Sequence, residues 1–150
     1  MNAPAAPGSA ASGPVTRAGR LLRPLAALAA VALPTAFVGV VDPNAPGHYP
    51  VCPVLRATGW WCPGCGGLRC VHALTRGDVL TAAHDNLVVV LLVLGLAVLW
   101  AGWVVRAVRG RPGWRPRWTA RRAGALVVVL LLFAVLRNLP IGAGLAPPGV

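Results

Sequence analysis

Three long apolar runs, separated by segments rich in polar residues, proline and glycine, form the main pattern of this chain. The runs cover residues 25–41, 87–105 and 123–141. Crossing about 30 Å of hydrocarbon at about 1.5 Å per residue takes roughly 20 helical residues. The third run reaches that length only if its helix continues through Arg137 and Asn138. The pattern therefore predicts an all-α integral membrane bundle of three transmembrane helices.

The segment between the first two runs, residues 42–86, is more polar and carries all four cysteines; we call it the Cys loop. Its second half returns to helical spacing, with apolar residues at Leu68, Val71 and Leu74. Gly77 is suited to end this helix, and Asp78 is suited to cap a following helix that runs through Asn86 into the second span. We expect a short interfacial helix between the first and second spans.

The composition excludes a water-soluble domain. Hydrophobic residues make up 57% of the 150 residues and charged residues only 11%, whereas a typical soluble domain is about 25% charged. The Pro-, Ala- and Ser-rich segment 1–20 is expected to be a disordered tail. The membrane domain then covers residues 21–141, and residues 142–150 form a short second tail.

The arginines predict the orientation in the membrane. All 14 basic residues are arginine, and ten of them lie either before the first run or between Arg106 and Arg122. Cytoplasmic flanks of membrane spans carry the excess of positive residues. We therefore expect a cytoplasmic N-terminus and an extracytoplasmic Cys loop. A cleaved signal peptide is the alternative interpretation of the first run, and it leaves the Cys loop on the same side.

The stretch from Arg106 to Arg122 interleaves arginine with Trp114 and Trp118. Such an interleaving can stack on single-stranded nucleic acid. A basic, Trp-containing loop beside a membrane span explains it with fewer assumptions, because anionic lipid headgroups attract such a segment electrostatically. We therefore expect lipid as the partner of this stretch, and not nucleic acid.

Three kinds of chemistry are open to the cysteines, which are Cys52, Cys62, Cys65 and Cys70. The simplest is a structural disulfide between Cys52 and either Cys62 or Cys65, formed in an oxidising compartment. Cys70 would then be a small buried apolar residue. This interpretation predicts a structural or interaction role, with an unidentified membrane protein as partner, and no enzymatic activity.

The second kind of chemistry is thiol–disulfide exchange by the Cys62 and Cys65 pair. On a regular helix Arg69 lies one turn after Cys65, where its charge would stabilise a thiolate. The chain shows no βαβ pattern, which excludes a thioredoxin fold. The protein would then be a helical membrane oxidoreductase.

The third kind is zinc binding, with Cys52, Cys62 and Cys65 as thiolate ligands. Cys70 comes five residues after Cys65, and on a helix that spacing turns its side chain to a different direction. The fourth ligand would therefore come from a non-helical position elsewhere in the chain.

The Cys loop resembles a known family. The segment CPVLRATGWWCPGCGGLRCVHALTRGDVLTAAHDN is similar to the signature of the bacterial membrane-protein family called domain of unknown function 2752 (DUF2752), which has C-P-x-C-G-x-T-R, a helix, Gly-Asp and an Asn that opens a span. The late RNLP segment also resembles the C-terminal end of that family. By position, the motif residues are Cys52, Cys62, Pro63, Cys65, Gly66, Arg69, Gly77, Asp78 and Asn86, with Arg137 and Asn138 near the end.

Two residues depart from the family pattern. Leu68 stands where the family usually has Thr, and Leu87 stands where Pro often follows the Asn. The resemblance implies a multi-pass protein of the bacterial cytoplasmic membrane, and it leaves the activity open.

Polar residues outside the cysteine motif suggest one further contact. Arg137 lies late in the third run, and Asp42 closes the first. We hypothesise that Arg137 pairs with Asp42 or caps the Cys-motif helix, so that it ties the third span to the Cys loop. The histidines His48, His72 and His84 show no clustered spacing, and we expect them to be solvated side chains and not ligands.

Overall fold

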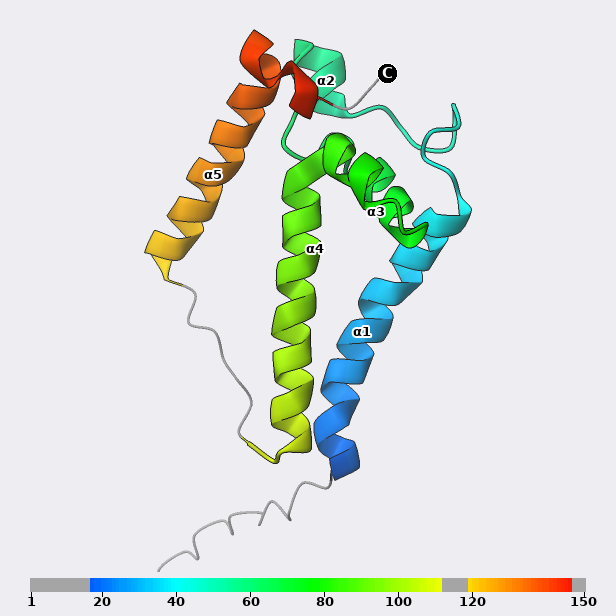
Figure 1. The fold of residues 1–150 in the computed structure, drawn as a ribbon, viewed down its shortest axis with the longest axis vertical. Helices are drawn as coiled ribbons and strands as arrows, with labels where there is room; N and C mark the ends of the chain where they lie inside the picture. The colour runs from blue at the N-terminus through cyan, green and yellow to red at the C-terminus, as the bar shows by residue number, and fades with distance from the viewer. Residues whose placement is uncertain (1–16, 112–118, 147–150) are drawn as a thin grey trace, which may run out of the picture.

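The computed structural model describes residues 17–111 and 119–146, and the regular secondary structure in these ranges is helical throughout. In chain order the elements are α1 (Arg17–Val40), α2 (Pro53–Thr58), α3 (Gly67–Thr75), α4 (Val79–Val108), α5 (Ala120–Asn138) and the 3-10 helix η1 (Pro140–Leu145). Figure 1 shows α1 and α4 as two long neighbouring rods, with the short helices gathered at their upper ends. The prediction of an all-α fold is confirmed for the described residues.

Two helices, α1 and α4, are long and apolar enough to cross a membrane. Only 11% of the most apolar stretch of α1 and 6% of that of α4 are buried within the protein. Their apolar side chains therefore face outward, which is consistent with contact with lipid. α1 begins at Arg17 and not near residue 25, because hydropathy marks the part of a helix that lies in hydrocarbon and not where the helix begins. Residues 17–20 of the predicted tail are thus helical, and residues 1–16 lie outside the described ranges.

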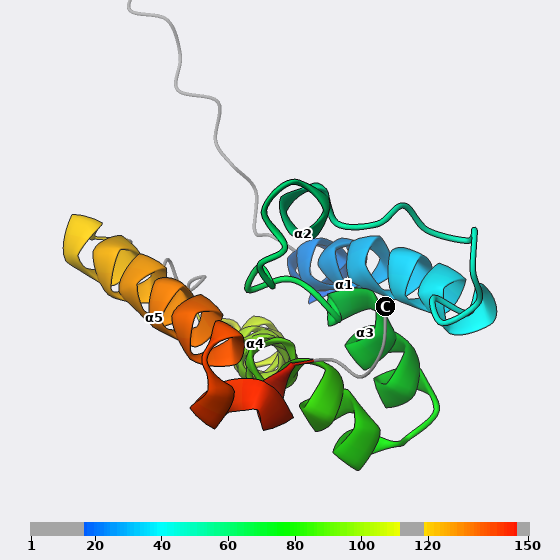
Figure 2. The same cartoon turned by 90° about the horizontal axis from the view of Figure 1, so that it is seen from above.

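The third long helix, α5, is less apolar than α1 and α4 over a membrane-spanning length. Its 19 residues include three arginines, Arg121, Arg122 and Arg137. It packs against η1, whereas α1, α3 and α4 pack against one another. Figures 1 and 2 show α5 leaning away from α4 at its N-terminal end and approaching it near the Cys loop. α5 is therefore joined to the other helices at its C-terminal end, and not packed along them as in a regular three-helix bundle. Residues 112–118, with Trp114 and Trp118, lie outside the described ranges.

A small core lies where α3 packs against α4. Its buried residues are Cys70, Ala73, Ala82 and Val90. Cys70 is fully buried, as expected for a small apolar residue. The predicted apolar face of α3 is only partly turned inward, because Leu74 packs against this core whereas Leu68 is 44% exposed. Small side chains at Cys70 and Ala73 permit a close approach of the two helices, and this decides which face turns inward.

α4 contains a kink that the apolar pattern of the sequence does not predict. Asn86 has φ −163° and ψ 95°, so residues 79–85 form a separate first segment. That segment lies beside α3 at the upper end of the molecule, and the long rod of α4 begins after Asn86 (Figure 1). The kink turns the start of α4 back over α3 and brings the Asn86 side chain within hydrogen-bond distance of the Pro63 and Cys65 carbonyls.

The junction between α3 and α4 matches the predicted capping. Gly77 has a φ of 77°, which glycine adopts without strain. The Asp78 carboxylate accepts hydrogen bonds from the Thr81 backbone N–H at 3.0 Å and the Thr81 hydroxyl at 2.6 Å. These two bonds hold the pKa of Asp78 below its usual value, so the cap is charged at neutral pH and weakens only in acid, as pH falls through that lowered pKa.

Replacing Asp78 with alanine is expected to lower the unfolding temperature in detergent by a few degrees, because the first turn of α4 loses its cap. Asp78→Asn keeps a side-chain acceptor and should stay close to the parent. Thermal unfolding followed by circular dichroism measures both variants. If Asp78→Ala unfolds at the parent temperature, the cap contributes nothing measurable to the fold.

Candidate functional site

The site is built on a tight turn that precedes α3. The Cys65 backbone N–H donates to the Cys62 carbonyl at 3.1 Å, which closes the turn over Pro63 and Gly64. Gly66 follows with a φ of 79°, and α3 begins at Gly67. Cys65 therefore lies before the helix and not within it. The prediction that Cys65 and Arg69 lie one turn apart on the same helix is wrong for this reason. The Arg69 side chain instead lies close enough to Asp85 to attract its carboxylate.

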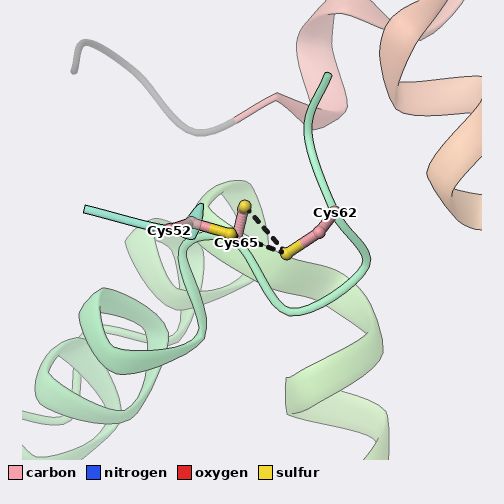
Figure 3. A group of neighbouring side chains, drawn as sticks. All are labelled: Cys52, Cys62 and Cys65. Carbon is pink, nitrogen blue, oxygen red and sulfur yellow. Dashed lines mark hydrogen bonds between the residues drawn. The ribbon is translucent and has the colours of Figure 1, made fainter. Parts of the chain in front are cut away.

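Three of the four cysteines come together at this turn. The sulfur atoms of Cys52, Cys62 and Cys65 all lie within 4.8 Å of one another. Figure 3 shows the three side chains turned toward one another, with a contact from the Cys62 sulfur to each of the other two sulfurs. The Cys62 and Cys65 sulfurs are 2.9 Å apart, and the Cys52 and Cys62 sulfurs are 3.5 Å apart. We call these three residues the thiol cluster.

The fourth cysteine, Cys70, does not join the cluster. Its thiol donates to the Asn86 carbonyl at 3.6 Å, inside the core between α3 and α4. The predicted separation of Cys70 from Cys65 is therefore confirmed. All four cysteines are free thiols in this structure.

Cys52 reaches the cluster from α2, a helix that the sequence analysis missed. Cys52 is the residue before α2, Pro53 occupies the first turn, and Gly59 ends the helix with a φ of 71°. Proline in a first helical turn and glycine after the last one are known helix signals. They enclose only six residues here, too few to show an apolar period.

Two thiols of the cluster, Cys52 and Cys65, differ in acidity. The backbone N–H of Leu55 favours the Cys52 thiolate and lowers the pKa of Cys52 to about 7. Burial raises the pKa of Cys65 to about 12, and the neighbouring Cys62 thiol adds to this effect. The Cys52 thiol, at the start of α2, is therefore more acidic than the Cys65 thiol.

The main chain of the turn is held by Arg137, which is 2% exposed. Its guanidinium donates to the carbonyls of Cys65 at 2.9 Å, Cys62 at 3.2 Å and Asp85 at 3.2 Å. Its Nε donates to the Leu145 carbonyl at 2.9 Å, and the guanidinium lies 5.0 Å from the centre of the Phe133 ring. Arg137 thus ties the end of α5 to the Cys loop, as the sequence suggested.

Arg137 does not pair with Asp42, which was one of the contacts that the sequence suggested. Asp42 faces His72 instead, with 3.7 Å between the carboxylate and Nε2. The Nδ1 of His72 lies 2.8 Å from the Val38 carbonyl. His72 is therefore a buried link between α1 and α3, and the expectation of a solvated side chain is wrong for this histidine. Helical spacing alone does not reveal that α3 lies against the end of α1.

Two asparagines complete the hold on the turn. The Asn86 amide donates to the carbonyls of Pro63 at 2.9 Å and Cys65 at 3.0 Å, and its oxygen accepts from the Val89 N–H. Asn138 accepts from the Trp61 N–H at 2.9 Å and donates to the Trp61 carbonyl at 3.0 Å. Asn86, Arg137 and Asn138, which we call the clamp, bind the backbone of residues 61–65 and leave the sulfur atoms free for chemistry.

A cavity of about 230 Å³ opens beside the thiol cluster. Cys52 and Cys65 both line it, together with backbone at the start of α3 and apolar side chains that include Tyr49, Trp61 and Leu68. Gly77 and Asp78, the remaining motif residues, lie at the other end of α3 and shape the fold. The cluster, its clamp and the cavity can hold a thiophilic ion or exchange a disulfide.

Comparison with known proteins supports one assignment. No curated protein and no solved structure matches the chain significantly. Residues 52–100 match the model of a family described as "Protein of unknown function (DUF2752)". This match begins at Cys52 and includes the thiol cluster, α3 and Asn86. The resemblance noted in the sequence is therefore confirmed over residues 52–100, which match the model of the DUF2752 family.

Proposed function

We propose that this protein is a membrane-bound metal-thiolate module, in which Cys52, Cys62 and Cys65 bind one zinc ion at the outer face of the bacterial cytoplasmic membrane. The observation that carries the proposal is the convergence of three sulfur atoms within 4.8 Å, from residues up to 13 positions apart in the chain. The role is structural or that of an interaction site, because zinc would hold the Cys loop in one conformation.

The spacing of the sulfurs suits a tetrahedral ion after a small adjustment. Zinc–sulfur bonds of about 2.3 Å at tetrahedral angles separate two sulfurs by about 3.8 Å. The Cys52 and Cys62 sulfurs are 3.5 Å apart, close to this value, and the Cys62 and Cys65 sulfurs are 2.9 Å apart. A rotation of one side chain would open the shorter distance without moving the clamped backbone.

The charges near the cluster also favour a divalent ion. Three thiolates and one Zn²⁺ carry a net charge of about −1. Arg137 is buried and donates to the carbonyls of Cys62 and Cys65, so its positive charge lies directly behind the cluster. The loaded site would be close to neutral, which reduces the cost of burying it.

The acidities of the thiols favour thiol–disulfide exchange less than they favour metal binding. If the acidic Cys52 attacked a disulfide of the other two at the Cys62 sulfur, Cys65 would be the leaving group. Burial raises the pKa of Cys65 to about 12, and thiols of high pKa leave slowly. A bound metal ion, in contrast, deprotonates its thiol ligands outright.

The placement in the membrane is part of the proposal. α5 contains 19 residues, which at about 1.5 Å each nearly span the hydrocarbon, and we take it as the third span with Arg137 and Asn138 held inside the protein. The N-terminal end of α1, which carries Arg17, Arg20 and Arg23, and the C-terminal end of α4, which is followed by Arg109 and Arg111, lie at the opposite end of the molecule from α2 and α3 (Figure 1). This separation supports a cytoplasmic arginine-rich end, in contact with anionic headgroups, and an extracytoplasmic cluster.

The metal content of purified protein tests the proposal. The full chain, prepared in detergent with reductant and incubated with zinc, is expected to retain about one zinc per chain after desalting. Cys52→Ser, Cys62→Ser and Cys65→Ser should each weaken zinc binding by at least about tenfold. Cys70→Ala is the matched control, because Cys70 lies in the core and not in the cluster.

Two results would contradict the proposal. One is a parent protein that binds no more zinc than the triple serine variant under reducing conditions. The other is a loss of zinc in Cys70→Ala equal to that in Cys62→Ser with the fold intact. Thiol alkylation and mass measurement on membranes prepared without reductant would then identify a disulfide as the native state.

A further inference from the structure

The thiol cluster supplies three ligands, and a zinc ion takes four. Resting on the proposed function, we infer that His48 is the fourth ligand, and that metal binding draws the segment around His48 over the cavity beside Cys52 and Cys65. In the structure as it stands, the His48 ring is outside the group of converging ligand atoms, which contains only the three cysteines among the described residues.

The spacing along the chain favours His48. Structural zinc sites commonly use two close pairs of ligands, each separated by a few residues. Cys62 and Cys65 form one such pair. His48 and Cys52, with three residues between them, would form the second. The cysteines alone provide only one close pair, so His48 completes the usual arrangement.

The cavity places this segment next to the cluster. Tyr49, Pro50, Val51 and Cys52 line the cavity in unbroken sequence, and His48 is the next residue. His48 is exposed, and Gly47 before it has a φ of 87°. Because the segment already forms a wall of the cavity and turns at a glycine, a local change at residues 47–51 would bring the ring toward the sulfurs without disturbing a helix.

The hydrogen bond of His48 uses Nδ1 and leaves Nε2 available to bind a metal ion. Its Nδ1 lies 2.9 Å from the Asp42 carbonyl, and a neutral ring there donates from Nδ1–H. The lone pair is then on Nε2. Histidine ligands to zinc commonly donate their second N–H to a backbone carbonyl in this way. A neutral imidazole also keeps the loaded site close to neutral beside Arg137.

The other two histidines are less suited. His72 is buried between α1 and α3, with its ring nitrogens facing the Val38 carbonyl and the Asp42 carboxylate. His84 lies in the first segment of α4, among residues that do not line the cavity. His84 is also exposed, which makes it a matched control for His48.

Cobalt binding to the full chain in detergent tests the inference, because Co²⁺ in a tetrahedral thiolate site gives strong visible bands. His48→Ala is expected to weaken Co²⁺ binding by at least about tenfold and to shift these bands. His84→Ala should match the parent. His48→Cys should restore tight binding and raise the thiolate-to-cobalt absorption by about a third, since four sulfurs replace three.

The outcomes separate the two proposals. If the parent binds Co²⁺ and His48→Ala binds it with the same affinity and spectrum, the fourth ligand is water or a group from another molecule, and the inference is overturned while the metal site stands. If the parent itself shows no cobalt bands that depend on Cys62, the proposed function fails. Because the His48 side chain is exposed, its replacement is expected to leave the fold intact. Far-UV circular dichroism of each variant checks this before the cobalt affinities are compared.

Discussion

Replacing Arg137 with leucine is expected to lower the free energy of unfolding by about 3–5 kcal/mol, the largest effect of any single substitution in α5. Four carbonyls lose a charged donor at once, and three of them, from Cys62, Cys65 and Asp85, belong to the Cys loop and the start of α4. Folded yield by size exclusion and thermal unfolding in detergent measure the loss.

Two variants separate the role of the donors from that of charge and helix propensity. Arg137→Lys keeps the positive charge but not the planar fork, and it should recover only part of the stability. Arg121→Leu removes an exposed arginine at the opposite end of α5 and should have little effect. If Arg137→Leu folds with the parent yield and unfolding temperature, the clamp does not hold the Cys loop.

Asn86→Asp is expected to be the next most damaging change, at about 3 kcal/mol or more. Asn86 is fully buried, and its amide nitrogen donates to the carbonyls of Pro63 and Cys65. An aspartate has nearly the same shape but presents an acceptor to both carbonyls. Its oxygen can still accept from the Val89 N–H, so the start of the long part of α4 stays capped.

The comparison with Asn86→Ala shows which part of the side chain matters. Alanine removes the amide donor from the Pro63 carbonyl and leaves the Cys65 carbonyl with its bond from Arg137, and it adds no charge. Asn86→Asp should therefore be at least as destabilising although it keeps the cap. Thermal unfolding and zinc retention together provide the measurement. An aspartate variant that is as stable as the parent would mean that the amide donors do not hold the turn.

Much of the fold is predictable from the apolar pattern. The long helices α1 and α4, the helix after the CPGC turn and the Asp78 cap were all expected, because each depends on residues close together in the chain. The kink at Asn86 was not expected. It depends on two carbonyl acceptors from a turn more than 20 residues earlier, and no local pattern contains that contact.

The candidate site was predictable in its residues and not in their roles. Cys52, Cys62 and Cys65 were identified as a set from their clustering in one loop, and they do converge. Arg69 was expected to be the cation near the pair, because it lies one helical turn away in sequence. The charge near the turn is instead Arg137, from 72 residues later than Cys65, since α3 begins only after the cysteine turn.

Local sequence determines where the helices of this protein lie, which residues cap them and which cysteines are candidates for chemistry. Apolar runs, capping residues and turn glycines act through neighbours in the chain, so they can be recognised in the sequence without knowledge of the fold. Only the tertiary structure decides that the polar side chains of Asn86, Arg137 and Asn138 bind backbone carbonyls and N–H groups of one turn. Buried backbone groups need partners wherever the chain brings them, and those partners come from helices distant in sequence.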